Sequence, residues 1–317
     1  MPVPQALLCL IAGPTATGKT GLAVELAREI DGEVISADSM QIYKGCAIGT
    51  AQPTPEECMG IPYHLVGCID ADQQWSVADW LRACQEKISE INGRGKAAIV
   101  AGGTGLYFKT LTTGLFEKAG AARNPELRRK LEAQWERGQS EALRKRLEAV
   151  DAEAAQRIHR NDAIRTVRAL EVYESTGRPL SELQAEDRAK HEAIPAYRYV
   201  LSGSRDWLYE RIDRRVLQMV EGGFVEELRK LAEKGASKDW PAMKALGYPQ
   251  MLDFVRGISS LEPAIAETQK LSRRYAKQQM VLYRKWPGAI WLDAENPKQT
   301  NLRFIQKNLE NMMPVAL

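Results

Sequence analysis

The chain has 317 residues, of which 44% are hydrophobic and 27% are charged, and its net charge is +3. This composition predicts a globular protein with one large core or two smaller ones, and it excludes a disordered chain. The five cysteines form no C-x-x-C pair, which argues against a disulfide framework or a zinc site, so we expect reduced cysteines. A charge of +3 is too small to indicate a nucleic-acid partner by itself.

The first apolar run, Ala6–Ala12, predicts a buried strand. It is short, it has no Lys or Arg before it, and it leads directly into a glycine-containing loop. We therefore expect a core strand and not a signal peptide or a membrane span. The corresponding expectation is a cytoplasmic protein with no membrane partner.

The loop after this run matches the pattern G-x-x-x-x-G-K-[ST], and a helix-like segment follows it at residues 21–30. Such loops bind phosphate because their backbone N–H groups and the N-terminus of the helix face the anion. The lysine reaches the outer phosphate, and the last hydroxyl can hold Mg²⁺. We therefore predict a diphosphate site formed by Gly13, Pro14, Thr15, Ala16, Thr17, Gly18, Lys19 and Thr20.

An acidic group follows the second predicted strand, residues 33–38, which ends at Asp38. Nucleotide kinases and NTPases with this loop also need an acid after another core strand. The best later strand, residues 96–101, runs instead into Gly102-Gly103-Thr104-Gly105 and has no carboxylate. Asp38 is therefore the candidate catalytic group, because ligands of open α/β sheets collect at the carboxyl ends of strands. The alternative is a turn or N-cap residue.

Strand and helix signals alternate as far as about residue 115 and predict a parallel sheet covered by helices. A stretch with almost no strand signal follows, and strand patterns return at residues 197–202 and 289–292. The fold class is therefore α/β, a P-loop parallel sheet flanked by helices, with an all-helical insertion domain. We expect a first core part at 1–116, the insertion at 117–195 and a second core part at 196–317. The predicted later helices are 124–135, 140–150, 151–158, 162–176, 205–220, 224–234 and 261–285.

The last of these helices carries a local excess of positive charge. From residue 269 to residue 288 there is no acid, and aromatic residues lie between the cations. This pattern suits RNA, because cations pair with phosphates and aromatic rings stack on bases. A solvated helix face with core aromatics explains it equally well. In the insertion, acids alternate with the cations, so ordinary surface pairing is the simpler interpretation. The residues concerned in the late helix are Lys270, Arg273, Arg274, Lys277, Arg284, Lys285, Tyr275, Tyr283 and Trp286.

These motifs together closely resemble one family, the bacterial tRNA dimethylallyltransferases, also called tRNA isopentenyltransferases. The resemblance covers nearly the whole chain, and it accounts for both the missing later acid and the Asp after the second strand. The motifs that carry it are Gly13–Thr20, Ile35–Tyr43, Ile48–Ala51, Gly102–Tyr107, Arg168–Val172 and Leu246–Tyr248.

The resemblance implies transfer of a dimethylallyl group from dimethylallyl diphosphate to the N6 amine of an adenosine in tRNA. The adenosine is the one 3′ of the anticodon in tRNAs that read codons beginning with U. By this likeness Asp38 is the general base, and Arg215 faces the diphosphate together with Lys19. Thr104 would contact substrate, and Thr20 would hold Mg²⁺ as the cofactor.

The resemblance also implies a set of tRNA contacts to the anticodon stem-loop, made by a chain that we expect to act as a monomer. Three positions depart from the common family pattern: Ile164 replaces a Gln, Gln278 an Arg and Leu282 a Trp. The matching contact residues are Asp38, Ser39, Met40, Gln41, Thr104, Arg128, Arg165, Arg168, Lys244, Gly247, Tyr248, Lys277, Gln279 and Arg284.

Three other functions remain as alternatives. A small-molecule kinase or NTPase shares the loop but needs a second acidic Mg²⁺ site. A prenyltransferase acting on free nucleotides would keep Asp38 and the loop, but it needs neither the helical insertion nor the basic helix. An RNA-binding scaffold with a relic nucleotide site would have no reason to retain both Lys19 and Thr20.

Overall fold

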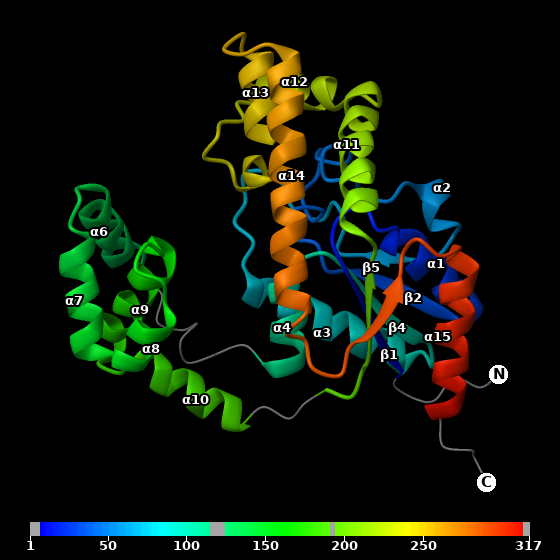
Figure 1. Cartoon of the computed structure of the whole chain (residues 1–317), viewed down its shortest axis with the longest axis horizontal. Helices are drawn as coiled ribbons and strands as arrows, with labels where there is room; N and C mark the ends of the chain where they lie inside the picture. The colour runs from blue at the N-terminus through cyan, green and yellow to red at the C-terminus, as the bar shows by residue number, and fades with distance from the viewer. Residues whose placement is uncertain (1–6, 115–123, 191–193, 313–317) are drawn as a thin grey trace. The chain divides into compact units, whose positions relative to one another are not determined.

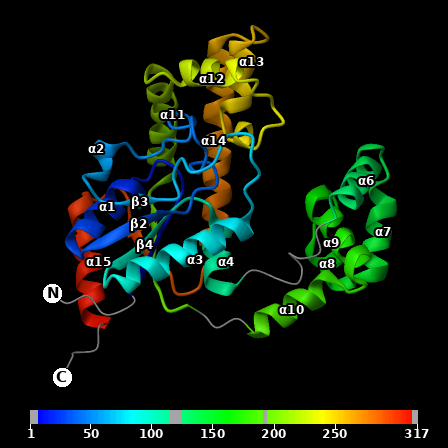
Figure 2. The ribbon, with the colours of Figure 1, turned by 180° about the vertical axis from the view of Figure 1, so that it is seen from behind.

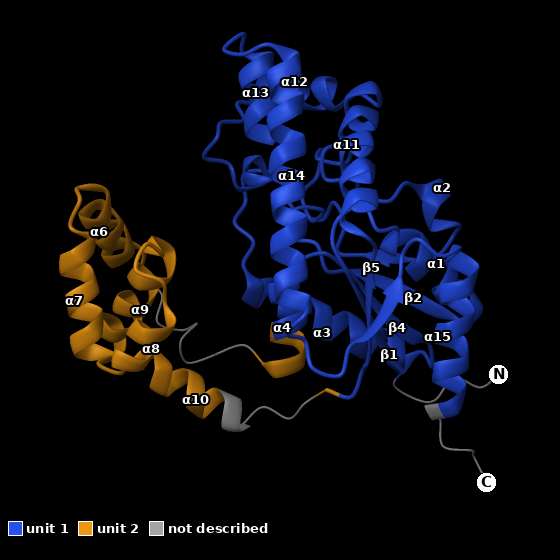
Figure 3. Ribbon diagram, in the orientation of Figure 1, with its two compact units in different colours: residues 1–109, 195–317 blue, residues 110–194 orange. Residues whose placement is uncertain are grey.

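The structure is a computed structural model that describes residues 7–114, 124–190 and 194–312. The predicted first strand residue, Ala6, and the predicted domain boundary at residues 116 and 117 lie outside these ranges. Two compact units are present, one made of residues 1–109 and 195–317 and the other of residues 110–194 (Figure 3). Within the described ranges, no helix is both long enough and apolar enough to cross a membrane.

The first unit contains a six-stranded sheet in which every neighbouring pair of strands is parallel. The order across the sheet is β3-β2-β4-β1-β5-β6. The predicted α/β class, a parallel sheet flanked by helices, is thus confirmed. The strands are β1 (Leu8–Ala12), β2 (Gly32–Ser36), β3 (Tyr63–His64), β4 (Ala97–Gly102), β5 (Tyr197–Ser202) and β6 (Ile290–Asp293).

Helices cover both faces of this sheet, which explains why its central strands are almost continuously apolar. Helices α1 (Lys19–Glu29) and α15 (Lys298–Met312) pack on one face, where Ile11, Leu26 and Ile305 share a core. Helix α3 (Val77–Gly93) lies on the other face (Figures 1 and 2). The Trp80 indole of α3 donates a 2.9 Å hydrogen bond to the Ser36 carbonyl at the end of β2.

A helical group extends the first unit beyond the carboxyl edge of the sheet (Figure 1). Its core is formed by apolar residues of several helices, among them Phe224, Tyr248 and Met251. The sequence predicts the three longest helices of this group but not its two shorter elements. Elsewhere in the chain it does not predict α2 (Pro55–Cys58), α4 (Gly105–Thr113) or α15. The group consists of α11 (Arg205–Glu221), α12 (Phe224–Glu233), η1 (Pro241–Lys244), α13 (Tyr248–Val255) and α14 (Leu261–Tyr283).

The second unit is all-helical within its described residues, 110–114 and 124–190. Polar side chains cap three of its helices: Asn124, Asp151 and Asp162 each accept the N–H of the residue three positions later. The sequence predicts these starts, but it does not predict the last helix, α10. The helices are α6 (Pro125–Glu136), α7 (Ser140–Val150), α8 (Ala152–Arg157), α9 (Ala163–Thr176) and α10 (Leu180–Lys190).

Candidate active site

The candidate site lies where the loops after β1, β2 and β4 meet, since these strands are neighbours in the sheet. The backbone ties two of the loops together: Ala37 N–H donates to Ala101 O at 2.8 Å, and Thr104 N–H donates to Ala37 O at 3.0 Å. Gly102 has no room for a side chain, because a Cβ would lie 2.3 Å from the Ala37 carbonyl. Strand β2 ends at Ser36, so Asp38 lies in the loop and not at the end of the strand as predicted.

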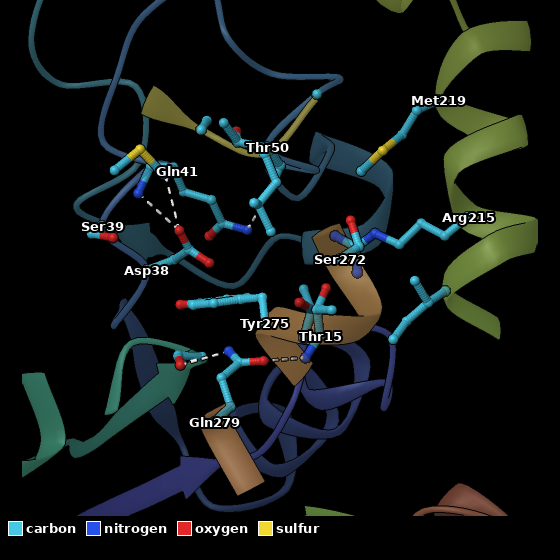
Figure 4. Close-up of a pocket in the computed structure, with 18 of the residues that line it drawn as sticks. Thr15, Asp38, Ser39, Gln41, Thr50, Arg215, Met219, Ser272, Tyr275 and Gln279 are labelled. Atoms are coloured by element: carbon cyan, nitrogen blue, oxygen red, sulfur yellow. Dashed lines mark hydrogen bonds between the residues drawn. The ribbon is translucent and has the colours of Figure 1, made fainter. Parts of the chain in front are cut away.

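A cavity of about 350 Å³ opens between these loops and helices α11 and α14 (Figure 4). Polar groups come mainly from the loops, whereas α11 contributes Ile212, Val216 and Met219, which form an apolar wall. The predicted residues that line the cavity are Thr15, Lys19, Thr20, Asp38, Ser39, Met40, Gln41, Arg215, Lys244 and Gln279. Other lining residues include Tyr63, Thr268 and Ser272, which the sequence did not single out, and Tyr275, one of the aromatic residues of the basic late segment.

The loop of residues 13–20 has the backbone that its glycines predict. Gly18 has a φ of +86°, and a Cβ at Gly13 would lie only 2.4 Å from the Leu201 carbonyl oxygen. Lys19 Nζ donates a 2.6 Å hydrogen bond to the Pro14 carbonyl, so the ammonium lies over its own loop. The remaining loop residues, Gly13, Pro14, Ala16, Thr17 and Gly18, shape the loop without lining the cavity.

Four charged side chains line the cavity: Lys19, Asp38, Arg215 and Lys244, of which Lys244 is exposed. Burial lowers the pKa of the Lys19 ammonium to about 7; the charge of Arg215 also lowers it, and the Asp38 carboxylate opposes both. Burial likewise lowers the pKa of Arg215, against the opposing effect of Asp38. Two half-buried cations and the exposed Lys244, with one carboxylate, leave a net positive site, which favours an anion.

Asp38 has the predicted turn role, and its position at the cavity is compatible with the catalytic role, which stays a prediction. Its Oδ1 accepts the backbone N–H of Met40 at 2.8 Å and of Gln41 at 3.3 Å, which is the predicted turn role. Its side chain also lines the cavity, where Figure 4 shows it on the side of the cavity opposite Arg215. The turn therefore holds the carboxylate in place while leaving Oδ2 without a partner in the described residues.

Gln41 is nearly buried, and its amide is fully used inside the protein. Its Nε2 donates to the carbonyl of Ala51 at 2.8 Å, and its Oε1 accepts from the Ser36 hydroxyl at 2.9 Å. The predicted RNA contact by this side chain would have to replace those bonds. Gln41 thus joins the Asp38 turn to the adjacent loop, whose Gly49 and Thr50 also line the cavity.

Glu227 of α12 anchors that adjacent loop, a role that no motif in the sequence predicts. The buried carboxylate accepts the N–H of Ile48 at 2.7 Å and of Gly49 at 3.0 Å, and the Tyr248 hydroxyl donates to it at 2.7 Å. Tyr248 itself is 0% exposed. Gly247 is also buried, with a φ of +89°. These placements give Tyr248 and Gly247 a structural role and do not support side-chain contact with RNA.

Gln279 connects the phosphate loop to the turn after β4. Its Oε1 accepts the Thr15 N–H at 3.1 Å, and its Nε2 donates to the Gly103 carbonyl at 2.7 Å. Thr104 is not among the cavity-lining residues; its Oγ1 accepts the Ser39 N–H at 3.0 Å. Both residues, predicted to contact substrate, therefore have partners that hold the loops of the site together.

Helix α14 and the turn that follows it present an exposed face that carries Arg274, Lys277, Val281, Arg284 and Lys285. Their spacing of three, four and seven residues places them on one side of the helix. No ion pair to these four cations occurs within the described residues. The aromatic residues behave differently: Tyr283 is fully buried and Trp286 packs on Phe108 at 5.3 Å, so for these two the core interpretation is correct.

In the second unit, Arg128 and Arg168 both contact Glu171, at 3.3 Å and 2.7 Å. Glu171 is only 1% exposed, and it also accepts the Asn124 N–H at 3.0 Å. The expectation of ordinary surface pairing is therefore wrong for this group, which is a buried carboxylate between two arginines. Arg165 is exposed and pairs with Asp162 at 3.3 Å, while Ile164 is 80% exposed.

The fold and the site define an α/β protein with a positively charged cavity at the carboxyl edge of its sheet, and comparison with known proteins identifies its family. Residues 41–286 match the family model described as IPP transferase, and residues 6–66 match the model described as isopentenyl transferase. The chain therefore belongs to the IPP transferase family, and it is a prenyltransferase.

Relatives with names and structures support this membership. The chain is 45% identical to the tRNA dimethylallyltransferase of Geobacter sulfurreducens over 90% of this chain and 91% of the relative. It is similar to the crystal structure of the Bacillus halodurans tRNA isopentenylpyrophosphate transferase, with a TM-score of 0.70 and 38% identity over 96% and 97% of the two chains. A eukaryotic dimethylallyltransferase acting on tRNA matches with a TM-score of 0.81 and 27% identity over 98% of this chain and 81% of that one.

Proposed function

We propose that this protein transfers the dimethylallyl group of dimethylallyl diphosphate to the N6 amine of the adenosine 3′-adjacent to the anticodon of tRNA. The tRNAs are those that read codons starting with U. One observation carries the proposal: Lys19, Arg215 and Asp38 line a single cavity that also has an apolar wall. The cavity is formed by residues of one unit of one chain, which supports action as a monomer, and we place that action in the cytoplasm.

The diphosphate group of the donor fits the loop of residues 13–20. Lys19 and Arg215 supply two positive charges, and backbone N–H groups of the loop and of α1 supply donors. Because diphosphate is the leaving group, these groups stabilise the negative charge that develops as the C1–O bond breaks. The apolar wall of Ile212, Val216 and Met219 offers a surface for the five-carbon chain.

The acceptor amine needs a group that takes its proton. The N6 nitrogen forms a bond to C1 of the dimethylallyl group, diphosphate departs with the electron pair of the broken C1–O bond, and the N6 proton passes to Asp38. The free Oδ2 of Asp38 is suited to this step because Oδ1 is held by the Met40 and Gln41 amides. A prenyl group cannot reach a stacked base, so the adenosine must leave its stack in the anticodon loop.

The residues present are suited to Mg²⁺. Thr20 and Asp38 bring a hydroxyl and a carboxylate to the cavity, and within the described residues no group of three or more acids, histidines or cysteines forms a separate metal cage. Protein-bound Mg²⁺ often takes one or two protein oxygens together with substrate phosphates. When bound, the ion would neutralise charge on the departing diphosphate. Thr20 is its proposed ligand, and Tyr63 lines the same cavity.

The RNA contacts proposed for α14 and the insertion rest on exposure and charge. Lys277 and Arg284 are exposed and lack ion-pair partners in the described ranges, so they are available to phosphates. Lys244 is exposed at the cavity. Ser39 and Met40 also line the cavity, which suits contact with the target base. In the insertion, Arg128, Arg165 and Arg168 would contact RNA while paired with acids.

The proposal is tested by incubating the protein with dimethylallyl diphosphate labelled in the dimethylallyl group and, in separate reactions, with tRNA, AMP or ATP. We expect label in tRNA alone, and in a fragment that contains the anticodon loop after nuclease digestion. Labelled AMP would support the free-nucleotide prenyltransferase instead. Hydrolysis of ATP that is lost in Lys19→Ala would support a kinase or NTPase and contradict the proposal.

A further inference from the structure

The phosphate loop is held from outside by a residue that neither the motifs nor the cavity lining single out. Arg211 of α11 donates a 2.8 Å hydrogen bond from Nε to the backbone carbonyl of Ala16, 195 positions away in sequence. Ala16 is the middle of the loop, between Gly13 and Lys19. A bond over this sequence distance fixes the position of the loop relative to the helix that also carries Arg215.

Ala16 needs such support because of its backbone. Its φ is +65°, a left-handed conformation that residues with a Cβ rarely adopt. Its methyl group is 7% exposed and packs with Leu208, Ile212 and Ala276. The surroundings must therefore hold this conformation, and strained backbone of this kind persists where the surrounding structure over-determines it. The Arg211 bond and this small apolar cluster contact Ala16 itself, whereas Gln279 holds the preceding residue through the Thr15 N–H.

The guanidinium of Arg211 is itself fixed in orientation. It lies over the Trp207 ring, with its Cζ 4.9 Å from the ring centroid. The plane of the guanidinium and the position of the ring together aim Nε at the Ala16 carbonyl. The next arginine along the helix, Arg214, instead forms an exposed i,i+4 ion pair with Glu210 at 2.5 Å and does not contact the loop.

We infer that Arg211 is a positioning residue for the donor diphosphate. It holds the Ala16 carbonyl, and through it the loop amides and Lys19, in the geometry that binds the diphosphate. It lies on the same face of α11 as Arg215, one turn before it. Arg211 does not line the cavity and is not proposed to touch substrate. The inference rests on the proposed function, since it assigns the loop to a diphosphate.

The test measures binding of inorganic diphosphate with Mg²⁺ by calorimetry, and donor and tRNA kinetics, for wild type, Arg211→Ala, Arg211→Lys and Arg214→Ala. For Arg211→Ala we expect about 10- to 100-fold weaker diphosphate binding and a similar loss in kcat/KM for the donor, with KM for tRNA unchanged. Arg211→Lys keeps the charge but not the planar stacked donor, so it should show a substantial part of this loss. Arg214→Ala removes the same charge from the same helix and should match wild type.

Each outcome has one meaning. If wild type itself does not bind diphosphate, the proposed function fails, whatever the variants do. If wild type binds and Arg211→Ala binds equally well, the inference is overturned. It is overturned as well if Arg211→Lys behaves as wild type or Arg214→Ala loses as much as Arg211→Ala, because charge alone would then explain the effect. Thermal unfolding is measured for every variant. If Arg211→Ala does not fold, Arg211→Lys serves as the test, provided that its unfolding midpoint is within a few degrees of that of wild type.

Discussion

The two units of the protein use their cations in different ways. In the second unit, every arginine from Arg144 to Arg178 forms an ion pair with a carboxylate. In the first unit, Lys19 and Arg215 face a cavity, and four cations of α14 and the turn after it are exposed without an ion-pair partner in the described residues. A cation paired with a carboxylate of the same chain stabilises the folded structure, whereas a cation without such a pair is available to bind an anionic ligand.

This difference bears on the residues to which the family resemblance assigns RNA contacts. Arg128 and Arg168 hold the buried Glu171, and Arg165 pairs with Asp162, so an RNA phosphate would have to compete with a carboxylate for each of them. Lys277 and Arg284 have no such competitor among the described residues. We therefore expect the loss of a cation to affect chemistry and binding in the first unit, and folding in the second.

The largest effect should come from the cavity itself, at Asp38. Asp38→Asn keeps the shape and the Oδ1 acceptor for the Met40 and Gln41 amides, but it removes the proton acceptor. General-base catalysis contributes about 10²- to 10⁴-fold, so single-turnover prenyl transfer should slow by that factor while diphosphate affinity changes little. A variant with near-normal single-turnover rates would leave Asp38 with its turn role only.

In the second unit, Arg128→Ala should act on stability. It leaves the 1% exposed Glu171 with one arginine in place of two, at a cost of about 1–3 kcal/mol in the free energy of unfolding. The matched control is Arg165→Ala, whose exposed pair with Asp162 is worth about 0–1 kcal/mol. Urea denaturation of the full chain measures both. Equal midpoints for the two variants would show that Glu171 does not depend on Arg128.

The sequence predicts most of the architecture because strong local signals determine it. The loop of residues 13–20 lies directly between an apolar strand and a helix, and capping residues such as Asn124 and Asp162 mark helix starts in the insertion. The short β3 and α13 were not predicted, since their hydrogen bonds and packing depend on partners far away in the sequence. The β3 strand, for example, has two residues and exists by pairing with β2.

The site was predicted in its loops but not in its helices. Lys19, Thr20 and Asp38 belong to contiguous motifs, whereas Glu227 and Arg211 act on loops 178–195 positions away and have no local pattern. The exposure of single side chains was not predicted either: Tyr248 is buried and donates a hydrogen bond to Glu227, whereas Tyr275 lines the cavity. Only the folded chain separates a residue that contacts ligand from one that holds its neighbour.

On α14, replacing Lys277 and Arg284 by Ala should weaken tRNA binding without affecting stability or diphosphate affinity. Each removed phosphate contact should lower the slope of log affinity against log salt by roughly one. Between about 50 and 200 mM salt, two contacts correspond to roughly a tenfold change in affinity. The control is Lys270→Ala, because Lys270 is paired with Glu267 at 3.0 Å. Parallel slopes for wild type and the double variant would show that this face is solvated and that RNA is bound elsewhere.

The smallest effect concerns the protonation of Lys19, whose pKa of about 7 sets the pH at which the free site holds its full charge. Below pH 7 the ammonium is already protonated. Above pH 7 the side chain is increasingly neutral, and diphosphate binding must draw a proton from solution. The affinity for diphosphate should therefore fall as pH rises through 7 and 8, by less than tenfold per pH unit. Lys19→Arg stays positively charged throughout this range. Diphosphate itself also takes up or releases protons here, but this contribution is the same for both proteins and cancels when they are compared. Calorimetry at pH 8 in buffers of different ionisation enthalpy should detect uptake of up to one more proton by wild type than by Lys19→Arg. Equal proton uptake by both would mean that the lysine is charged before the diphosphate arrives, as the cations of α14 are before RNA binds.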